Sequence, residues 1–115
     1  MNVIVAGSRD FNKYDLLCDK LDFFLSEQSD IQIVCGEARG ADSLGKRYAK
    51  EHGYDVLSFP AEWSKYGKSA GYRRNQAMAE AADALVAFWD GSSKGTANMI
   101  EIMKKNGKPV RVIRY

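Results

Sequence analysis

Five short apolar runs, separated by longer segments with helical spacing, are the feature that most constrains how this 115-residue chain folds. The runs are expected to form strands over Asn2–Ala6, Ile31–Cys35, Asp55–Phe59, Ala84–Phe88 and Pro109–Ile113. The segments between them are expected to form helices over Lys13–Gln28, Ala41–His52, Ser69–Ala82 and Thr96–Asn106. Because the runs are apolar throughout rather than alternating, they predict strands that are buried on both faces.

This β-α alternation predicts the fold class. Strands joined by right-handed helical crossovers form a parallel sheet that is covered by helices on both faces. We therefore expect an α/β protein: one Rossmann-like, three-layer domain over residues 1–115, with a parallel sheet of about five strands. The segment 60–68 joins the third strand to the third helix, has no clear element of its own and is rich in aromatic and basic residues.

Composition excludes several classes of protein. Apolar residues make up 45% of the chain and charged residues 28%, as in ordinary globular proteins, and no apolar run approaches the roughly 20 residues that span a bilayer. No signal peptide is visible, so we expect a cytoplasmic protein without a membrane partner. The net charge of +2 is too small to predict nucleic-acid binding. The single His52 and the distant Cys18 and Cys35 give no metal-site pattern, so neither a metal nor a cofactor is predicted.

Three predicted strands end in small, charged turns, at residues 7–10, 36–42 and 90–96. At any single turn, Gly and Ser can be present only because the chain must turn between a strand and a helix, without any ligand. The carboxyl ends of parallel strands, however, meet at one edge of the sheet, and a helix N-terminus that follows a glycine-rich turn attracts anions. The three turns together therefore predict a shared site for a phosphate-bearing ligand.

The candidate contacts in these turns are of several kinds. Arginine side chains can neutralise phosphate, carboxylates can accept ribose hydroxyls, orient the arginines or cap helices, and tryptophan can stack on a base or pack in the core. Helix capping is the favoured alternative for Asp42, and core packing is the alternative for Trp89. The candidate ligand-binding residues are Gly7, Ser8, Arg9, Asp10, Gly36, Glu37, Arg39, Gly40, Asp42, Trp63, Arg74, Asn75, Trp89, Asp90, Gly91, Ser92, Gly95 and Thr96.

Five motifs occur in order along nearly the whole chain: Gly7-Ser8-Arg9-Asp10-Phe11; residues 36–42; residues 60–63 with 66–68; Ala70-Gly71 with residues 74–78; and residues 88–92 with Gly95-Thr96. Together they resemble the YspA-like branch of the YpsA-related SLOG superfamily, which occurs in bacterial and phage proteins. The resemblance implies a Rossmann-like domain that binds nucleotides or nucleotide-derived small molecules, and it does not supply a particular ligand.

A more distant resemblance bears on catalysis. The Lonely Guy phosphoribohydrolases of the same superfamily carry an Arg on the helix before the last glycine turn, followed by a PGGxGTxxE motif whose Glu assists in cleaving an N-glycosidic bond. Arg74 keeps the spacing of that helix and Gly95-Thr96 matches the GT, but the position of the Glu is Met99. Glu101 is two residues further on, which rotates it by about 200° around a helix. The resemblance therefore implies that the hydrolytic carboxylate is missing.

Three functional hypotheses follow. The favoured one is binding, for sensing or sequestration, of a nucleotide or an ADP-ribose-type signal at the carboxyl edge of the sheet. The alternative is an N-glycosidase in which Glu37, Asp90 or Glu101 replaces the missing acid beside Arg74.

The third is a nucleic-acid module, disfavoured by the net charge, that uses the basic and aromatic side chains of residues 63–74 as a stacking platform. Superfamily relatives often form homodimers, whereas this chain shows no marked apolar interface stripe, so the oligomeric state stays open.

Overall fold

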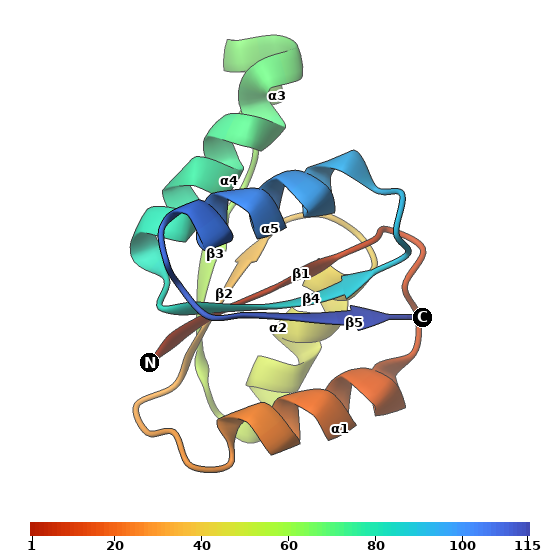
Figure 1. Ribbon diagram of the computed structural model, residues 1–115, viewed down its shortest axis with the longest axis vertical. Helices are drawn as coiled ribbons and strands as arrows, with labels where there is room; N and C mark the ends of the chain where they lie inside the picture. The colour runs from red at the N-terminus through yellow and green to blue at the C-terminus, as the bar shows by residue number, and fades with distance from the viewer.

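The computed structural model describes residues 1–115 and confirms the α/β fold with a five-stranded, all-parallel sheet (Figure 1). The strands are β1 (Asn2–Gly7), β2 (Gln32–Gly36), β3 (Asp55–Phe59), β4 (Ala84–Trp89) and β5 (Val110–Arg114). The helices are α1 (Tyr14–Leu25), α2 (Ala41–His52), α3 (Trp63–Tyr66), α4 (Ala70–Ala81) and α5 (Lys94–Lys105). The strand order is β3-β2-β1-β4-β5, so the chain winds outward from β1 in both directions.

The alternation of side chains along β1 divides the core into two layers. Val3 and Val5 face α1 and α2, whereas Ile4 and Ala6 face α4 and α5. Figure 1 shows these two helical layers on opposite faces of the sheet. Because both faces are covered, the three central strands β2, β1 and β4 are almost wholly buried.

The two edge strands correct one expectation. Burial on both faces was expected of every strand, but Val56 of β3 and Val112 of β5 keep 37% and 39% of their surface exposed. Each edge strand pairs with a single neighbour, β2 or β4, and α2, α4 and α5 pack more on the central strands than on the edge strands. The apolar character of β3 and β5 therefore reflects one covered face rather than two.

The segment between β3 and α4 is more regular than expected. It contains the single-turn helix α3 and a 3₁₀ turn over Gly67–Ser69, and it lies beyond the end of the sheet at the top of Figure 1. Elsewhere the expected boundaries shift slightly: α1 ends at Leu25 and α5 begins at Lys94, so Gly95 and Thr96 lie in the first turn of α5. None of the helices has the length and apolar character needed to cross a membrane.

Candidate functional site

A cavity of about 390 Å³ lies at the carboxyl edge of the sheet, on the face that α4 and α5 cover. It is bounded by the end of β1, the loop and first turn of α2, the inner face of α4 and the first turns of α5. The lining residues are Ala6, Gly7, Arg9, Ala38, Asp42, Trp63, Lys68, Gly71, Tyr72, Arg74, Asn75, Met78, Ser93, Lys94, Gly95, Thr96 and Met99. The turns after β1, β2 and β4 thus meet at one place, as the sequence predicted.

The turn that opens α5 is held in shape by its own side chains. Asp90 Oδ1 accepts the backbone N–H groups of Ser92 and Ser93 at 2.9 and 2.8 Å, and these bonds lower the pKa of Asp90 to about 2. The buried Ser8 hydroxyl accepts the N–H of Asp90 and lies 3.1 Å from the Ser93 hydroxyl. These bonds tie the loop after β1 to the loop after β4, and they direct the first turn of α5 into the cavity.

Arg74 enters the cavity from α4 and packs on the backbone of β2. Gly36 makes this approach feasible, because a Cβ at residue 36 would collide with the Arg74 guanidinium and would lie 2.9 Å from Asp42 Oδ2. The Arg74 Nε donates to Asn75 Oδ1 at 3.1 Å. The terminal guanidinium nitrogens form no hydrogen bond and no ion pair, so they are free to meet a ligand.

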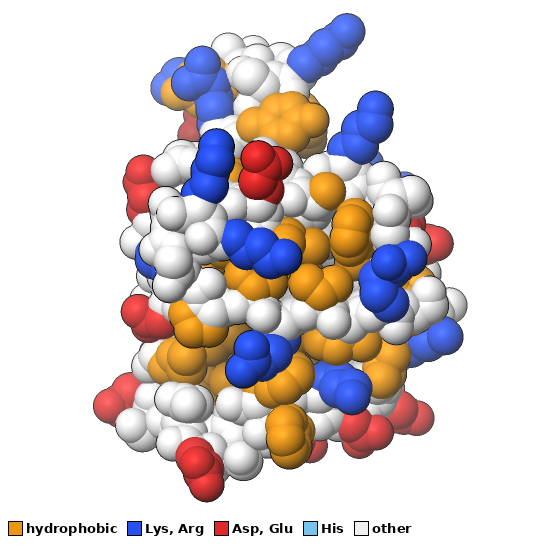
Figure 2. All heavy atoms as spheres, viewed as in Figure 1, with side chains coloured by type: hydrophobic (Ala, Val, Ile, Leu, Met, Phe, Trp, Pro, Cys, Tyr) orange, Lys and Arg blue, Asp and Glu red, His pale blue; other side chains and the backbone are white.

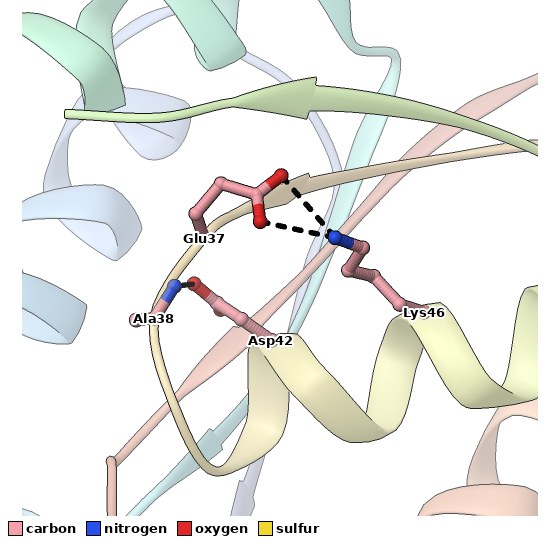
Figure 3. Close-up of polar contacts among 4 residues, drawn as sticks. All are labelled: Glu37, Ala38, Asp42 and Lys46. Carbon is pink, nitrogen blue, oxygen red and sulfur yellow. Dashed lines mark hydrogen bonds and ion pairs between the residues drawn. The ribbon is translucent and has the colours of Figure 1, made fainter.

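Asp42 is the one carboxylate in the cavity lining. It lies in the first turn of α2, is 5% exposed, and its Oδ2 accepts the Ala38 N–H at 3.3 Å (Figure 3). Gly40, with a φ of 74°, forms the turn that brings α2 back beneath this loop. Burial raises the pKa of Asp42 to about 7, although the guanidinium of Arg74, the Ala38 N–H and the guanidinium of Arg9 oppose the rise.

Asn75 braces the two helices that enclose the cavity. Its side chain is 5% exposed, and its Nδ2 donates to Gly95 O at 3.1 Å and to Asn98 Oδ1 at 3.0 Å. Its Oδ1 accepts the hydrogen bond from Arg74 Nε, so both polar atoms of the Asn75 side chain are already hydrogen-bonded to the protein. Asn75 therefore fixes Arg74 relative to the first turn of α5.

The outer part of the cavity combines aromatic and cationic side chains. Trp63 and Tyr72 are 53% and 51% exposed. Lys68 and Lys94 add two ammonium groups to the guanidinium groups of the lining. These side chains offer a planar ring and an anion each a matching contact. On the side of the molecule where β5 and α5 lie, the surface also carries Lys and Arg side chains with apolar side chains exposed between them (Figure 2).

Eight of the eighteen candidate residues line the cavity, namely Gly7, Arg9, Asp42, Trp63, Arg74, Asn75, Gly95 and Thr96. Ser8 and Asp90 hold the loops, as described. Ser92, Gly36, Arg39 and Gly40 lie in the same turns but outside the lining. Glu37 turns to Lys46, with an Oε2–Nζ distance of 3.0 Å (Figure 3).

The remaining candidates lie toward β5. Asp10 accepts the Tyr115 hydroxyl at 2.5 Å. The Trp89 ring packs against the α4 and α5 core, lies 5.4 Å from the Arg114 guanidinium and donates from Nε1 to Ser93 O. Gly91 lies against the same Arg114 guanidinium. These three residues therefore have partners within the fold and stand apart from the cavity.

The two α5 positions that bear on hydrolysis, Met99 and Glu101, lie in different surroundings. Met99 is 1% exposed and lines the cavity, so the position that carries Glu in the Lonely Guy motif does face the site, with a thioether in place of a carboxylate. Glu101 is exposed on α5 and does not line the cavity. No group of three or more His, Cys, Asp or Glu side chains is placed to hold a metal ion.

Several residues that line the cavity were not among the candidates from the sequence. They include Lys68, Gly71, Tyr72, Met78, Ser93 and Lys94. Met78 is one helical turn after Arg74, so helical spacing could have placed it on the same face. Lys68 lies in the 3₁₀ turn before α4, whose path no sequence pattern indicated, and Tyr72 lies in the first turn of α4.

The fold and the cavity define a Rossmann-like α/β protein whose ligand-sized cavity, at the carboxyl edge of the sheet, is rich in cationic side chains. The chain belongs to the YspA, cpYpsA-related SLOG family (YAcAr), whose profile matches residues 1–66. It is 35% identical to the Gene 61 protein of Mycobacterium phage D29, over 94% of this chain and 92% of the phage protein. Its fold is similar to that in the X-ray structure of TM1055, with a TM-score of 0.67, 22% identity, and coverage of 95% of this chain and 71% of the other.

Proposed function

We propose that this protein binds a nucleotide or a nucleotide-derived small molecule, such as an ADP-ribose-type signal, in the cavity at the carboxyl edge of the sheet. The observation that carries the proposal is the composition of one cavity: Arg9, Lys68, Arg74 and Lys94 contribute four cations to its lining, and half-exposed Trp63 and Tyr72 belong to the same lining. A phosphate group matches the cations and the helix N-terminus, and a base matches an aromatic ring. Membership of the SLOG family supports the same class of ligand.

Binding rather than hydrolysis is proposed because of where the carboxylates lie. Of the acids considered for an N-glycosidase, Glu37 is paired with Lys46, Asp90 is engaged in its own turn and Glu101 is on the exposed side of α5. None of the three lines the cavity, and the position facing it from α5 is Met99. These placements remove the three acids considered for an N-glycosidase from the cavity and so favour binding; Asp42, the one carboxylate in the lining, was not among those three.

The contacts of the α3–α4 segment also favour a small molecule over a nucleic acid. The Arg73 guanidinium lies 4.3 Å from the centre of the Tyr66 ring, and Lys65 Nζ lies 5.0 Å from it, so this ring already has cationic partners. Trp63 and Arg74 instead line the cavity. The basic and aromatic residues thus divide between a surface cluster around Tyr66 and the lining of the cavity, whereas a single-strand platform needs them along one open groove.

The test is a thermal-shift screen of the purified protein with nucleoside mono-, di- and triphosphates, NAD and ADP-ribose, followed by mass spectrometry of each mixture. A ligand that binds the folded state raises the melting temperature by mass action. We expect a shift with the ligand recovered intact. A shift accompanied by release of the base would replace the binding proposal with an N-glycosidase, and the absence of a shift with every compound would reject a nucleotide site.

Arg74→Ala is the variant that assigns the binding to this cavity. Loss of a charged hydrogen bond costs about 1.5–3 kcal/mol, so the dissociation constant should rise by roughly 10- to 150-fold. Arg47→Ala is the matched control, because Arg47 lies on α2 with its Nε 3.4 Å from Glu51 and does not line the cavity. Equal affinities for the two variants would remove Arg74 from the site.

A further inference from the structure

The Asp42 end of the cavity has an unusual balance of charge. Arg74 reaches it from α4, and Arg9 reaches it from the loop after β1. Neither arginine forms an ion pair, and the only hydrogen bond between them and the protein joins Arg74 Nε to Asn75. Two guanidinium groups therefore face the cavity with their terminal N–H donors unused. They lie beside the Asp42 carboxyl, whose residue is only 5% exposed.

The other ionisable groups around Asp42 do not change this balance. Cys35, on β2, has a pKa raised to about 11, mainly by burial, so it is neutral in the physiological range. Glu37 is ionised, and its charge is matched by Lys46. His52 is ten residues along α2, about 15 Å away by helical rise. The charges that act most on the Asp42 carboxyl are therefore those of Arg74 and Arg9.

The protonation state of Asp42 decides which ligand group can lie there. An ionised Asp42 would repel a phosphate held by Arg9 and Arg74, because like charges at a poorly solvated site disfavour each other. A protonated Asp42 removes that repulsion, and its hydroxyl can donate to a phosphate oxygen. A ribose hydroxyl pair would suit an ionised Asp42, but it would leave the donor-only guanidinium groups with less acceptor capacity than a phosphate provides.

We propose that Arg9, Asp42 and Arg74 form a second anion subsite, distinct from the first turn of α5, and that an anionic group enters it together with one proton on Asp42. The inference rests on the proposed function and extends it. The ligand then carries two anionic groups, as a diphosphate does: one lies at the first turn of α5 and the other between Arg9 and Arg74. A ligand of this class binds more tightly as the pH falls.

The experiment measures ADP-ribose binding by titration calorimetry between pH 6 and pH 9. Both phosphates of ADP-ribose stay singly charged over this range, so the ligand itself contributes no phosphate titration. We expect the dissociation constant to rise by roughly 25-fold between pH 6.5 and pH 8.5, because a carboxyl with a pKa of about 7 in the free protein must be protonated when the ligand binds. At pH 8, titrations in two buffers of different ionisation enthalpy should report uptake of close to one proton per ligand bound.

Asp42→Asn is the decisive variant, because it keeps an acceptor for the Ala38 N–H and has no proton to gain. Its affinity should be independent of pH, with no proton uptake. Glu51→Gln removes the same charge at the far end of α2, where Glu51 pairs with Arg47, and should keep the wild-type pH dependence. The calorimetry of the wild-type protein is decisive by itself if Asp42→Asn does not fold.

The outcomes separate the two proposals. Binding of ADP-ribose without proton uptake, or with affinity that rises with pH, overturns the subsite and leaves the proposed function standing. Binding of nucleoside monophosphates without binding of ADP-ribose does the same. Failure of every nucleotide to bind at any pH overturns both.

Discussion

The Arg74 guanidinium and the Asp42 carboxyl approach each other over the bare backbone of Gly36. Arg74 comes from α4, Asp42 from the first turn of α2, and Gly36 from the end of β2, so three elements distant in sequence meet there. The meeting depends on a residue without a side chain. That dependence makes the geometry of the site open to direct test.

Gly36→Ala should weaken ligand binding by displacing Arg74. The new Cβ would collide with the guanidinium, and the flexible end of the arginine is the part that can move. We expect the dissociation constant of the nucleotide to rise by about tenfold, which corresponds to roughly 1.4 kcal/mol of binding free energy. The melting temperature of the free protein should change little.

A double-mutant cycle checks this mechanism. If Gly36→Ala acts through Arg74, the substitution should have little further effect in an Arg74→Ala background, since residues in contact are coupled. Additive effects of the two substitutions on binding would show that Gly36 contributes in another way.

Asp42→Asn should alter how the stability of the free protein depends on pH. The pKa of Asp42 is raised from its ordinary 3.8 to about 7 in the folded protein, so the folded state holds its proton more tightly than the unfolded chain does. The resulting stabilisation is complete below about pH 4 and is lost as the pH rises through 7. The Asn variant lacks this loss, so its melting temperature relative to wild type should increase between pH 4.5 and pH 8.

The upper limit of that relative gain is about 4 kcal/mol, because one unit of pKa shift corresponds to about 1.4 kcal/mol. Thermal unfolding of both proteins at several pH values without ligand is the measurement. Parallel curves of melting temperature against pH would show that Asp42 titrates normally in the folded protein.

The sequence predicted the fold because each strand and helix carries its own pattern. The apolar run of β1 and the helical spacing of α4 are local features, and the parallel order of the sheet follows from the crossovers between such units. The convergence of the three turns follows from the same rule. Boundaries were less accurate at α1 and α5, where local hydrogen bonds at the turn decide the first and last residues.

The details of the site depended on contacts that no local pattern records. The burial of Asp42 follows from the packing of α4 over the end of β2, and nothing in residues 36–42 alone distinguishes it from a solvated capping residue. Trp89 is the last residue of β4 and packs on the face of the sheet that carries the cavity, yet its indole Nε1 donates to Ser93 O and the ring does not line the cavity. Lys68 was missed because its position depends on the short α3 helix and the 3₁₀ turn that follows it.

Asp90→Ala should weaken ligand binding even though Asp90 lies outside the cavity lining. Removal of the carboxylate frees the N–H groups of Ser92 and Ser93 and loosens the turn that directs α5 into the cavity. We expect a several-fold loss of nucleotide affinity and faster hydrogen exchange of the Ser92 and Ser93 amides. Asp90→Asn keeps an acceptor oxygen and should lie between the alanine variant and wild type.

The pH dependence of the Asp90 contribution has the opposite sign to that of Asp42. The pKa of Asp90 is lowered to about 2 by the two backbone bonds, so its stabilisation is present above about pH 4 and is lost as the pH falls toward 2. Amide exchange and melting temperatures above and below pH 4 measure this. An Asp90→Ala variant that matches wild type in both would show that the turn holds without the carboxylate.

Trp63→Ala should separate base stacking from packing. Trp63 is 53% exposed at the mouth of the cavity, so its removal should change the melting temperature little. Stacking of a base on an aromatic ring contributes about 1–3 kcal/mol, so nucleotide affinity should fall by roughly 5- to 150-fold. Affinity for inorganic diphosphate, which has no base, should stay the same.

Tyr66→Ala is the matched control, because Tyr66 is also partly exposed on α3 but contacts Arg73 rather than this cavity. Equal losses of nucleotide and diphosphate affinity in the Trp63 variant would mean that the ring shapes the cavity rather than stacking on a base.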